Sequence, residues 1–322
     1  MDLDQLAEGV RAGQRGALAR AITLAESRRP EHRSQARRLL ELLPPGRSHR
    51  IGITGPPGAG KSTLIESLGL AWIQAGARVA VLAVDPTSQL SGGSILGDKT
   101  RMEQLSTNPG AYIRPSPNGK TLGGVTRSTR QAIELVEAAG YNLVIVETVG
   151  IGQADTLVSR LVDTVALVVI PGAGDELQGI KRGVMEIADL LVINKCEGDN
   201  QARAAQASAQ YHAALRLLPG RTPDWKVPIL RVSGLTHDGL DELRTRLDAH
   251  GRFLEENDSL ARQRREQATF WLDYLLDESL REAVLGKSQS RARYEACRRA
   301  VSEGLKSPEA AIEELLSGLS FE

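Results

Sequence analysis

The sequence has little of what marks secreted, zinc-binding or membrane-spanning proteins. Its 322 residues include two cysteines, Cys196 and Cys297, and five scattered histidines, which argues against a disulfide framework or a zinc site of clustered Cys and His. No apolar run reaches the ~18 residues that cross a bilayer. The opening residues, MDLDQLAEGVRAG, lack the basic and apolar regions of a secretory signal. We therefore expect a protein of a reducing compartment, the cytoplasm.

An excess of charge of one sign is also missing. The chain carries 40 basic and 40 acidic side chains, so its net charge gives no general attraction to nucleic acid or to an anionic membrane. Hydrophobic residues make up 41% and charged residues 25% of the chain, as in folded soluble proteins and unlike disordered ones. The composition predicts a folded protein with neither nucleic acid nor membrane as its partner.

The chain is predicted to have helical regions at both ends. Residues 1–49 place apolar residues at helical spacing and form a helical extension, which either covers one side of the next domain or binds a partner. Residues 251–322 contain no strand-like run, and a wide apolar stripe recurs from Ala268 to Val284 at helical spacing. That stripe pairs with a second subunit or caps the chain's own core. We favour a dimerisation region.

Residues 50–250 alternate short apolar runs with helical stretches of mixed polarity. Runs rich in Val, Ile and Leu suit strands that are buried on both faces, and the alternation implies right-handed crossovers. The predicted fold class is α/β, a mostly parallel sheet flanked by helices, with its ligand at the carboxyl ends of the strands. The runs are Arg50–Thr54, Val79–Val84, Leu143–Glu147, Thr164–Ile170, Leu190–Asn194, Val227–Val232 and, more weakly, Ala111–Arg114.

A phosphate-binding loop follows the first of these runs. The segment GPPGAGKS, residues 55–62, lies between a predicted strand and a predicted helix, which is the context that this pattern requires. The glycines let backbone N–H groups curl around a phosphate. Lys61 would bridge the β- and γ-phosphates, and the Ser62 hydroxyl would ligate Mg²⁺. The predicted nucleotide contacts here are Gly55, Pro56, Pro57, Gly58, Ala59, Gly60, Lys61, Ser62 and Thr63.

Further metal and phosphate contacts are predicted at neighbouring strand ends. Asp85 and Glu147 each end an apolar run, and Asp98 lies in a glycine-containing loop of the kind that orders around a γ-phosphate. These three carboxylates are candidate Mg²⁺ ligands, each of which could instead be a cap or turn residue. Gly150 could place its amide on the γ-phosphate. Gln153 either orients the attacking water or is an ordinary loop residue.

The residues after the two last strands predict a guanine site. Asn194, Lys195 and Glu197 follow one apolar run, and Ser233 and Gly234 follow the next. An amide beside a carboxylate that accepts two N–H groups suits guanine, because the edge of adenine has the opposite order of donors and acceptors. Ser233 and Gly234 would supply a backbone contact to the base.

Together these segments resemble the MeaB/ArgK/MMAA-type family of G proteins over essentially the whole chain. The resemblance implies a GTPase that chaperones an adenosylcobalamin-dependent acyl-CoA mutase, usually methylmalonyl-CoA mutase, by gating cofactor loading and protecting the enzyme. It also implies a homodimer built partly through the C-terminal helices. The segments that carry it are GPPGAGKST, VLAVDPTSQLSGGSILGDKTRM, YIRPSP, TLGGVTRSTR, VIVETVGIGQAD, PGAGDELQGIKRGVMEIADL and NKCEGDN.

The resemblance also assigns roles to residues. Asp85, Asp98 and Glu147 resemble the acidic metal-site residues of the family, and the segment with Asp175, Gln178 and Lys181 resembles a third switch that links nucleotide state to the mutase. The residues alone would give a glycine-hinged helix start there. The family's base-reading motif is usually Asn-Lys-x-Asp, and Glu197 departs from it. Its extra methylene moves the carboxylate by ~1.5 Å and weakens guanine selection unless the loop yields.

We expect slow GTP hydrolysis by the isolated protein, since neither an arginine finger nor a strong general base can be assigned. Three alternatives remain open at this point. An ATP-dependent kinase of a transport system would need an acceptor site that the sequence does not nominate. A metal-delivery GTPase would need ligands, but the histidines are scattered and the cysteines have no partner motif. A non-enzymatic scaffold is disfavoured by the intact Lys61 and Ser62.

Overall fold

A computed structural model describes residues 2–27, 29–84, 102–115, 122–148, 153–172, 182–286 and 288–317, without the side chains of 122–126, 153–155, 182, 283, 288 and 289. The chain divides into two units, residues 1–263 and 264–322. The first unit holds the sheet and the predicted nucleotide site, and the second is helical.

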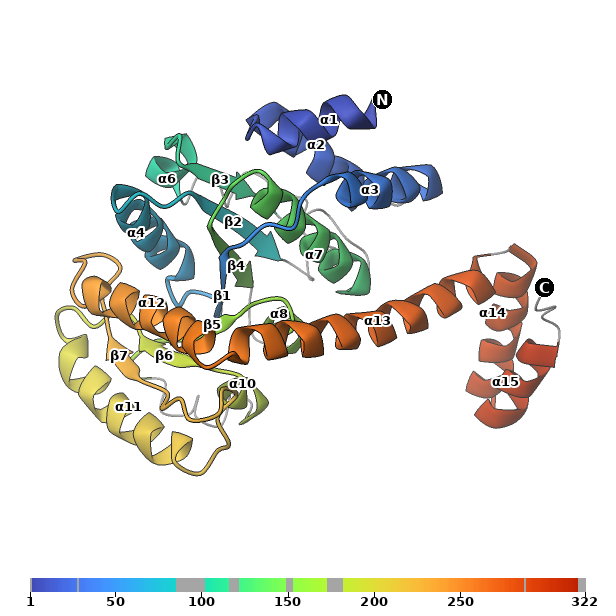
Figure 1. Ribbon diagram of the computed structural model, residues 1–322. Helices are drawn as coiled ribbons and strands as arrows, with labels where there is room; N and C mark the ends of the chain where they lie inside the picture. The colour runs from blue at the N-terminus through green and yellow to red at the C-terminus, as the bar shows by residue number, and fades with distance from the viewer. Residues whose placement is uncertain are drawn as a thin grey trace. The chain divides into compact units, whose positions relative to one another are not determined.

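Within the described residues, seven parallel strands form one sheet in the order β3-β2-β4-β1-β5-β6-β7 (Figure 1). Every apolar run that the sequence offered as a strand is confirmed, including the weak one, which is the edge strand β3. β2, β4, β5 and β6 are buried along their whole length, as the continuous apolar runs predicted. The strands are β1 (His49–Thr54), β2 (Val79–Val84), β3 (Ala111–Arg114), β4 (Leu143–Thr148), β5 (Thr164–Val169), β6 (Leu190–Ile193) and β7 (Ile229–Arg231).

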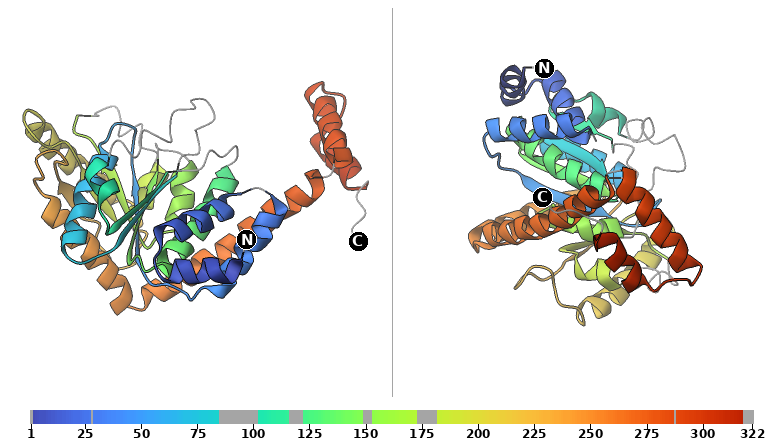
Figure 2. Two further views of the ribbon diagram at one scale, coloured as in Figure 1. Left: turned by 90° about the horizontal axis from the view of Figure 1, so that it is seen from above. Right: turned by 90° about the vertical axis from the view of Figure 1, so that its right-hand side faces the viewer.

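Helices cover both faces of the sheet, so the predicted α/β class is confirmed (Figure 2). On one face Leu64, Leu68 and Leu243 pack against Ile51 and Ile53. The helices on that face are α4 (Lys61–Gln74), α6 (Glu103–Thr107) and α12 (Leu240–Glu256), and those on the other are α7 (Leu122–Ala138), α8 (Gln153–Ser159), α10 (Arg182–Glu186) and α11 (Asn200–Leu215).

The position of β1 explains where a ligand can bind. β1 lies between β4 and β5, and the chain continues from it to β2 on one side and later to β5 on the other. The crossovers on the two sides therefore diverge at the carboxyl end of β1, which is where open parallel sheets bind their ligands. The loop of residues 55–60 begins at that point.

The N-terminal helices pack on α7, which agrees with the interpretation that they cover one side of the sheet domain. Leu18 and Ile22 of α2 are fully buried, and Arg114 of β3 forms an ion pair with Glu26 at the end of α2. Asp2 caps the first helix by accepting from two backbone N–H groups. The helices are α1 (Leu3–Arg11), α2 (Arg15–Glu26) and α3 (Pro30–Leu42).

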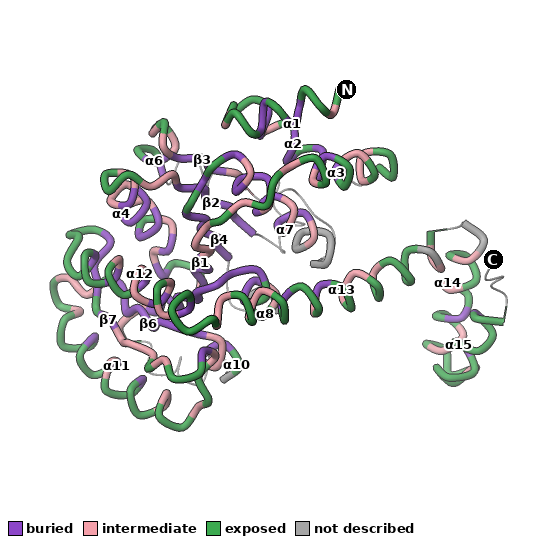
Figure 3. The backbone as a smooth tube through the Cα atoms, in the orientation of Figure 1, coloured by how far each residue is buried: buried purple, intermediate pink, exposed green. Residues whose placement is uncertain are grey.

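The last helices carry a partly exposed apolar surface. α13 (Ser259–Leu285) begins in the first unit, and α14 (Ser288–Ser302) packs against α15 (Pro308–Ser317) in the second. Exposed residues recur along α13 (Figure 3), and among them Leu272, Leu276 and Leu280 are 68%, 54% and 52% exposed. Among the described residues, none of the helices combines the length and apolar character that crossing a bilayer requires.

Candidate functional site

The loop of residues 55–60 has the backbone of a phosphate-binding loop. Gly55, Gly58 and Gly60 have φ angles of 149°, 78° and 83°, which residues with a Cβ rarely adopt. A Cβ on Gly55 would lie 2.0 Å from the carbonyl oxygen of Val168, and a Cβ on Gly60 would lie 2.5 Å from Nδ2 of Asn194. The predicted requirement for glycine therefore has a steric basis at two positions.

Lys61 begins α4 directly after this loop, and its side chain folds back over it. The Lys61 ammonium is buried and donates to the carbonyl oxygens of Gly55 at 2.8 Å and Pro56 at 3.1 Å. An α-helix leaves the N–H groups of its first turn without intrahelical acceptors and carries partial positive charge at that end. The loop, the helix start and the ammonium together form an anion site.

The structure brings together two of the four predicted metal ligands, Ser62 and Glu147. Ser62 lies in the first turn of α4 and donates its hydroxyl to Oε1 of Glu147 at 2.9 Å. Glu147 is near the carboxyl end of β4, opposite Ile53 of β1, and is 5% exposed. A hydroxyl and a carboxylate are oxygen ligands of the kind that Mg²⁺ prefers. The donor set beside Lys61 therefore fits a magnesium ion bound with phosphates.

A buried hydroxyl pair that sequence reasoning missed joins the phosphate loop to β4. Thr148 donates to Oγ1 of Thr54 at 2.9 Å, and both side chains are buried. Thr54 directly precedes the glycine loop, and Thr148 directly follows Glu147. The signal was present in the sequence as a threonine at each of two strand ends, but the pairing of β1 with β4 was needed to read it.

Asn194 joins the phosphate loop to the predicted base-reading loop. Its Nδ2 donates to the carbonyl oxygen of Ala59 at 2.8 Å, and its Oδ1 accepts from the backbone N–H of Gly234 at 3.0 Å. Lys195, next in sequence, is exposed and has a φ angle of 61°. Ser233 accepts at its Oγ from the N–H groups of two following residues, which fixes this turn.

Glu197 holds a buried acceptor that lacks a donor. Its Oε2 is inaccessible to solvent, and none of the described residues donates to it. A buried carboxylate oxygen without a hydrogen bond is costly, so a ligand that brings an N–H group to it would be favoured. The preceding residue, Cys196, donates its thiol to the carbonyl oxygen of Ile193 at 3.1 Å, and burial raises the pKa of that thiol. A protonated thiol is a poor metal ligand.

Several predicted site residues belong to segments that the structure does not describe. Asp85, Asp98, Gly150, Asp175, Gln178 and Lys181 lie outside the described residues. Gln153 begins α8, but its side chain is not described. The described part of the predicted site consists of the phosphate loop, Ser62 with Glu147, and the two loops that Asn194 joins.

Comparison with known proteins identifies the family. Residues 18–289 match the family described as methylmalonyl-CoA mutase-associated GTPase MeaB. A Caulobacter vibrioides protein is 50% identical over 323 residues, which cover 100% of this chain and 99% of that protein. The mouse methylmalonic aciduria type A homolog, mitochondrial, is 42% identical over 98% of this chain and 79% of its own length.

A solved structure entitled LAO/AO transport system kinase shares the fold. It superposes with a TM-score of 0.77 at 35% identity, over 98% of this chain and 96% of that one. The family match covers most of the chain, including the phosphate loop, Glu147 and the base-reading segment. The chain belongs to the MeaB family of methylmalonyl-CoA mutase-associated GTPases.

Proposed function

We propose that this protein binds Mg²⁺ and GTP at the carboxyl edge of the sheet, hydrolyses GTP to GDP and phosphate, and uses its nucleotide state to chaperone a mutase. The observation that carries the proposal is the double hydrogen bond of Asn194, which holds the phosphate loop and the base-reading loop in one site. Because Asn194 fixes the distance between the two loops, the phosphates and the base of one nucleotide can bind to both at once.

The residues of the site would have separate roles in GTP hydrolysis. The Lys61 ammonium and the loop N–H groups would stabilise charge on the phosphate oxygens during in-line attack by water. Ser62 and Glu147 would hold Mg²⁺, together with Asp85 and Asp98. Bound Mg²⁺ neutralises charge on the β- and γ-phosphates. We assign Gly150 to the γ-phosphate and Gln153 to the orientation of the attacking water.

Guanine would be read by the residues around Glu197. Asn194, Lys195 and the turn at Ser233 and Gly234 would enclose the base, and the donor-free oxygen of Glu197 would accept from its N–H groups. This arrangement supports GTP over ATP, because adenine offers an acceptor in place of the guanine N1–H donor. Equal dissociation constants for GTP and ATP would overturn the assignment of the base.

The partner would be an adenosylcobalamin-dependent acyl-CoA mutase, with methylmalonyl-CoA mutase favoured by the family description. Nucleotide state would gate cofactor loading, and the segment with Asp175 and Lys181 would act as the switch. We propose three regions, a helical extension at 1–49, a GTPase domain at 50–250 and a dimerisation region at 251–322, in a cytoplasmic homodimer. The exposed leucines of α13 support the dimer.

Two measurements test this function. Wild-type protein should hydrolyse GTP slowly when alone, and Lys61→Ala should abolish hydrolysis and weaken binding. Rates of ~1–100 s⁻¹, as in kinases, would contradict a partner-regulated switch. Co-purification with candidate mutases in GTP, GDP or a non-hydrolysable analogue should yield a complex that changes with the nucleotide. A complex indifferent to nucleotide would argue against the chaperone role.

The second candidate is an ATP-dependent kinase, because the similar solved structure carries the name of a transport system kinase. A kinase would transfer the terminal phosphate to an acceptor instead of to water. Incubation with γ-labelled ATP and with γ-labelled GTP separates the two functions. Label recovered only as inorganic phosphate, and only from GTP, would support the GTPase and exclude the kinase.

A further inference from the structure

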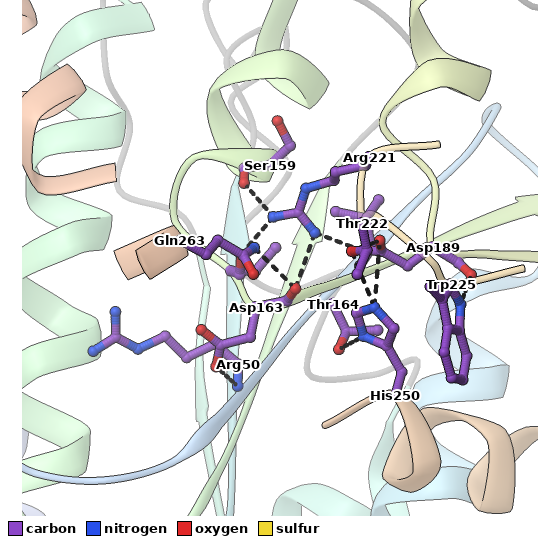
Figure 4. A network of polar contacts seen from close by, with 12 residues as sticks. Arg50, Ser159, Asp163, Thr164, Asp189, Arg221, Thr222, Trp225, His250 and Gln263 are labelled. Carbon is purple, nitrogen blue, oxygen red and sulfur yellow. Dashed lines mark hydrogen bonds and ion pairs between the residues drawn. The ribbon is translucent and has the colours of Figure 1, made fainter. Parts of the chain in front are cut away.

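A buried polar network lies at the opposite edge of the sheet from the predicted nucleotide site (Figure 4). Its centre is Arg221, in the segment between α11 and β7. Asp163 and Asp189, which immediately precede β5 and β6, also belong to it, so it lies at the amino ends of those strands. None of the predicted site residues that the structure describes belongs to this network, and the proposed chemistry does not use it.

Arg221 binds the last carbonyl group of α8 and two carbonyl groups of the turn that joins α8 to β5. Its Nη2 donates to the carbonyl oxygens of Ser159 at 2.9 Å and Val162 at 2.8 Å, and its Nη1 donates to that of Asp163 at 2.9 Å. Carbonyl groups at the end of a helix lack intrahelical donors and carry partial negative charge. A guanidinium is therefore a favourable partner for them, and its planar fork fixes their positions more closely than a lysine ammonium would.

Asp189 holds the guanidinium in this place. Its Oδ2 accepts from Nη1 of Arg221 at 2.5 Å and from the N–H of Val165 at 2.9 Å, while Oδ1 accepts from the hydroxyl of Thr222 at 2.6 Å. Burial raises the pKa of this carboxyl, but the charge of Arg221 and the hydrogen bond of His250 outweigh it and hold the pKa at about 2. The acceptor of Arg221 is therefore ionised at neutral pH.

A second side chain reaches the same carbonyl groups. Gln263, in α13, donates through Nε2 to the carbonyl oxygens of Val162 at 3.3 Å and Asp163 at 3.1 Å. Figure 4 shows Gln263 and Arg221 converging on this turn. The turn from α8 to β5 is thus held by two side chains from distant parts of the sequence.

α8 connects this turn to the predicted nucleotide site. β4 ends at the nucleotide edge with Glu147 and Thr148, and α8 then leads to the start of β5 at the opposite edge. A helix of seven residues is ~10 Å long, and its backbone hydrogen bonds couple its two ends. A shift at its carbonyl end would therefore be passed on to its beginning at Gln153.

We infer that Arg221 and Gln263 are positioning residues that fix the turn after α8 and, through this turn, α8 and Gln153, for GTP hydrolysis. This inference rests on the proposed function. The phosphate loop and the base-reading loop would bind the nucleotide. The contacts of Arg221 and Gln263 would instead set the geometry of the hydrolytic step through α8. Loss of these contacts should therefore slow hydrolysis without weakening the binding of GDP.

The variants Arg221→Lys and Gln263→Ala test the inference in the full-length protein. Lysine keeps the charge beside Asp189 but cannot reproduce the fork, and Gln263→Ala leaves both carbonyl groups their bonds to Arg221, so it should fold. Gln201→Ala, at an exposed position of α11, is the matched control. The measurements are the single-turnover rate with GTP, the dissociation constant of GDP and the urea midpoint of unfolding.

We expect Arg221→Lys and Gln263→Ala to lower the rate by about 3- to 30-fold, Arg221→Lys more, with the GDP dissociation constant within about twofold of wild type. An unchanged rate with a lowered urea midpoint, or GDP binding that weakens in parallel with the rate, would overturn the inference and leave the proposed function standing if Lys61→Ala still abolishes hydrolysis. Wild-type protein that neither binds nor hydrolyses GTP would overturn both.

Discussion

At the scale of single residues, Glu197 offers a direct test of base recognition. Glu197→Gln replaces one carboxylate oxygen with an amide donor, which would face the N–H groups of guanine. Hydrogen bonds to charged groups contribute roughly 1.5–3 kcal/mol, so we expect GTP affinity to fall by about 10- to 150-fold. ATP binding should change little. Isothermal titration with both nucleotides measures the effect.

Glu256→Gln is the control for this variant, since Glu256 is an exposed glutamate in α12. It should leave both affinities unchanged. Glu197→Asp should bind GTP at least as tightly as wild type, because it restores the residue usual in the family. If Glu197→Gln bound GTP as wild type does, the donor-free oxygen would have no role in the base site.

The lowered pKa of Asp189 predicts how the free energy of unfolding changes in acid. Its pKa of about 2 lies below the 3.8 of an unfolded aspartate, so its charged form stabilises the folded state. This contribution is complete above pH 3.8 and is lost as the pH falls through 2. The difference corresponds to about 2 kcal/mol.

Urea unfolding between pH 2 and 5 checks this contribution. Wild-type protein should lose stability steeply in that window, and Asp189→Asn should be less stable at pH 5 but show a shallower decline. An equally steep decline in both proteins would mean that other carboxylates dominate the acid response. The basis for the expected difference is the ion pair with Arg221, because the charged carboxylate is the form that the guanidinium stabilises.

At the scale of elements, the two glycines that flank α4 can be compared directly. Gly60 precedes the helix with a φ angle of 83°, and Gly76 follows it with a φ angle of 91°. Alanine at either site costs about 1 kcal/mol in backbone strain. The new Cβ would collide at Gly60, 2.5 Å from Nδ2 of Asn194, whereas no atom of the described residues lies within 4 Å of a Cβ at Gly76.

We therefore expect Gly76→Ala to lower the unfolding free energy by about 1 kcal/mol and Gly60→Ala to lower it further, and Gly60→Ala alone to weaken GTP binding by about 100-fold or more. The physical reason is that the collision separates the phosphate loop from the base-reading loop. Thermal unfolding and nucleotide titration of the same preparations give both quantities. Equal nucleotide affinities in the two variants would contradict the role given to Asn194.

The strands and the phosphate loop could be predicted from the sequence because each has a characteristic local pattern. Strands buried on both faces, such as β2 and β5, are continuous apolar runs, and a loop that must curl around phosphate needs glycines at fixed spacing. The short helices α6 and α10 have too few residues to show a period and were not predicted individually.

Contacts between distant segments were beyond what sequence patterns can predict. Ser62 and Glu147 were each nominated, but their hydrogen bond depends on the pairing of β1 with β4. Arg221 was not nominated, because nothing in the neighbouring sequence indicates that three carbonyl groups converge on it. Glu147 and Asn194 could be nominated from the sequence because they lie at the carboxyl ends of strands, where ligands bind in this fold class.

At the scale of the whole molecule, the exposed surface of α13 predicts the oligomeric state. Leu272, Leu276 and Leu280 are spaced by four residues, so they share one face of the helix, and each is at least 52% exposed in the single chain. In a monomer these three side chains stay in water and add no hydrophobic stabilisation. Their burial against a second copy would contribute about 5–9 kcal/mol to the free energy of dimerisation, before the cost of association. We therefore expect the wild-type protein to sediment as a dimer at micromolar concentration.

Leu276→Glu, in the middle of this stripe, should shift the sedimentation coefficient to that of a monomer, because a dimer would have to bury a carboxylate. The control is Leu217→Glu, since Leu217 is 83% exposed after α11 and lies outside the stripe. The nucleotide residues lie in the first unit, so both variants should retain the slow hydrolysis of the isolated protein. A Leu276→Glu protein that remains a dimer would place the subunit interface elsewhere, and a wild-type monomer would remove the reason for an apolar face on α13.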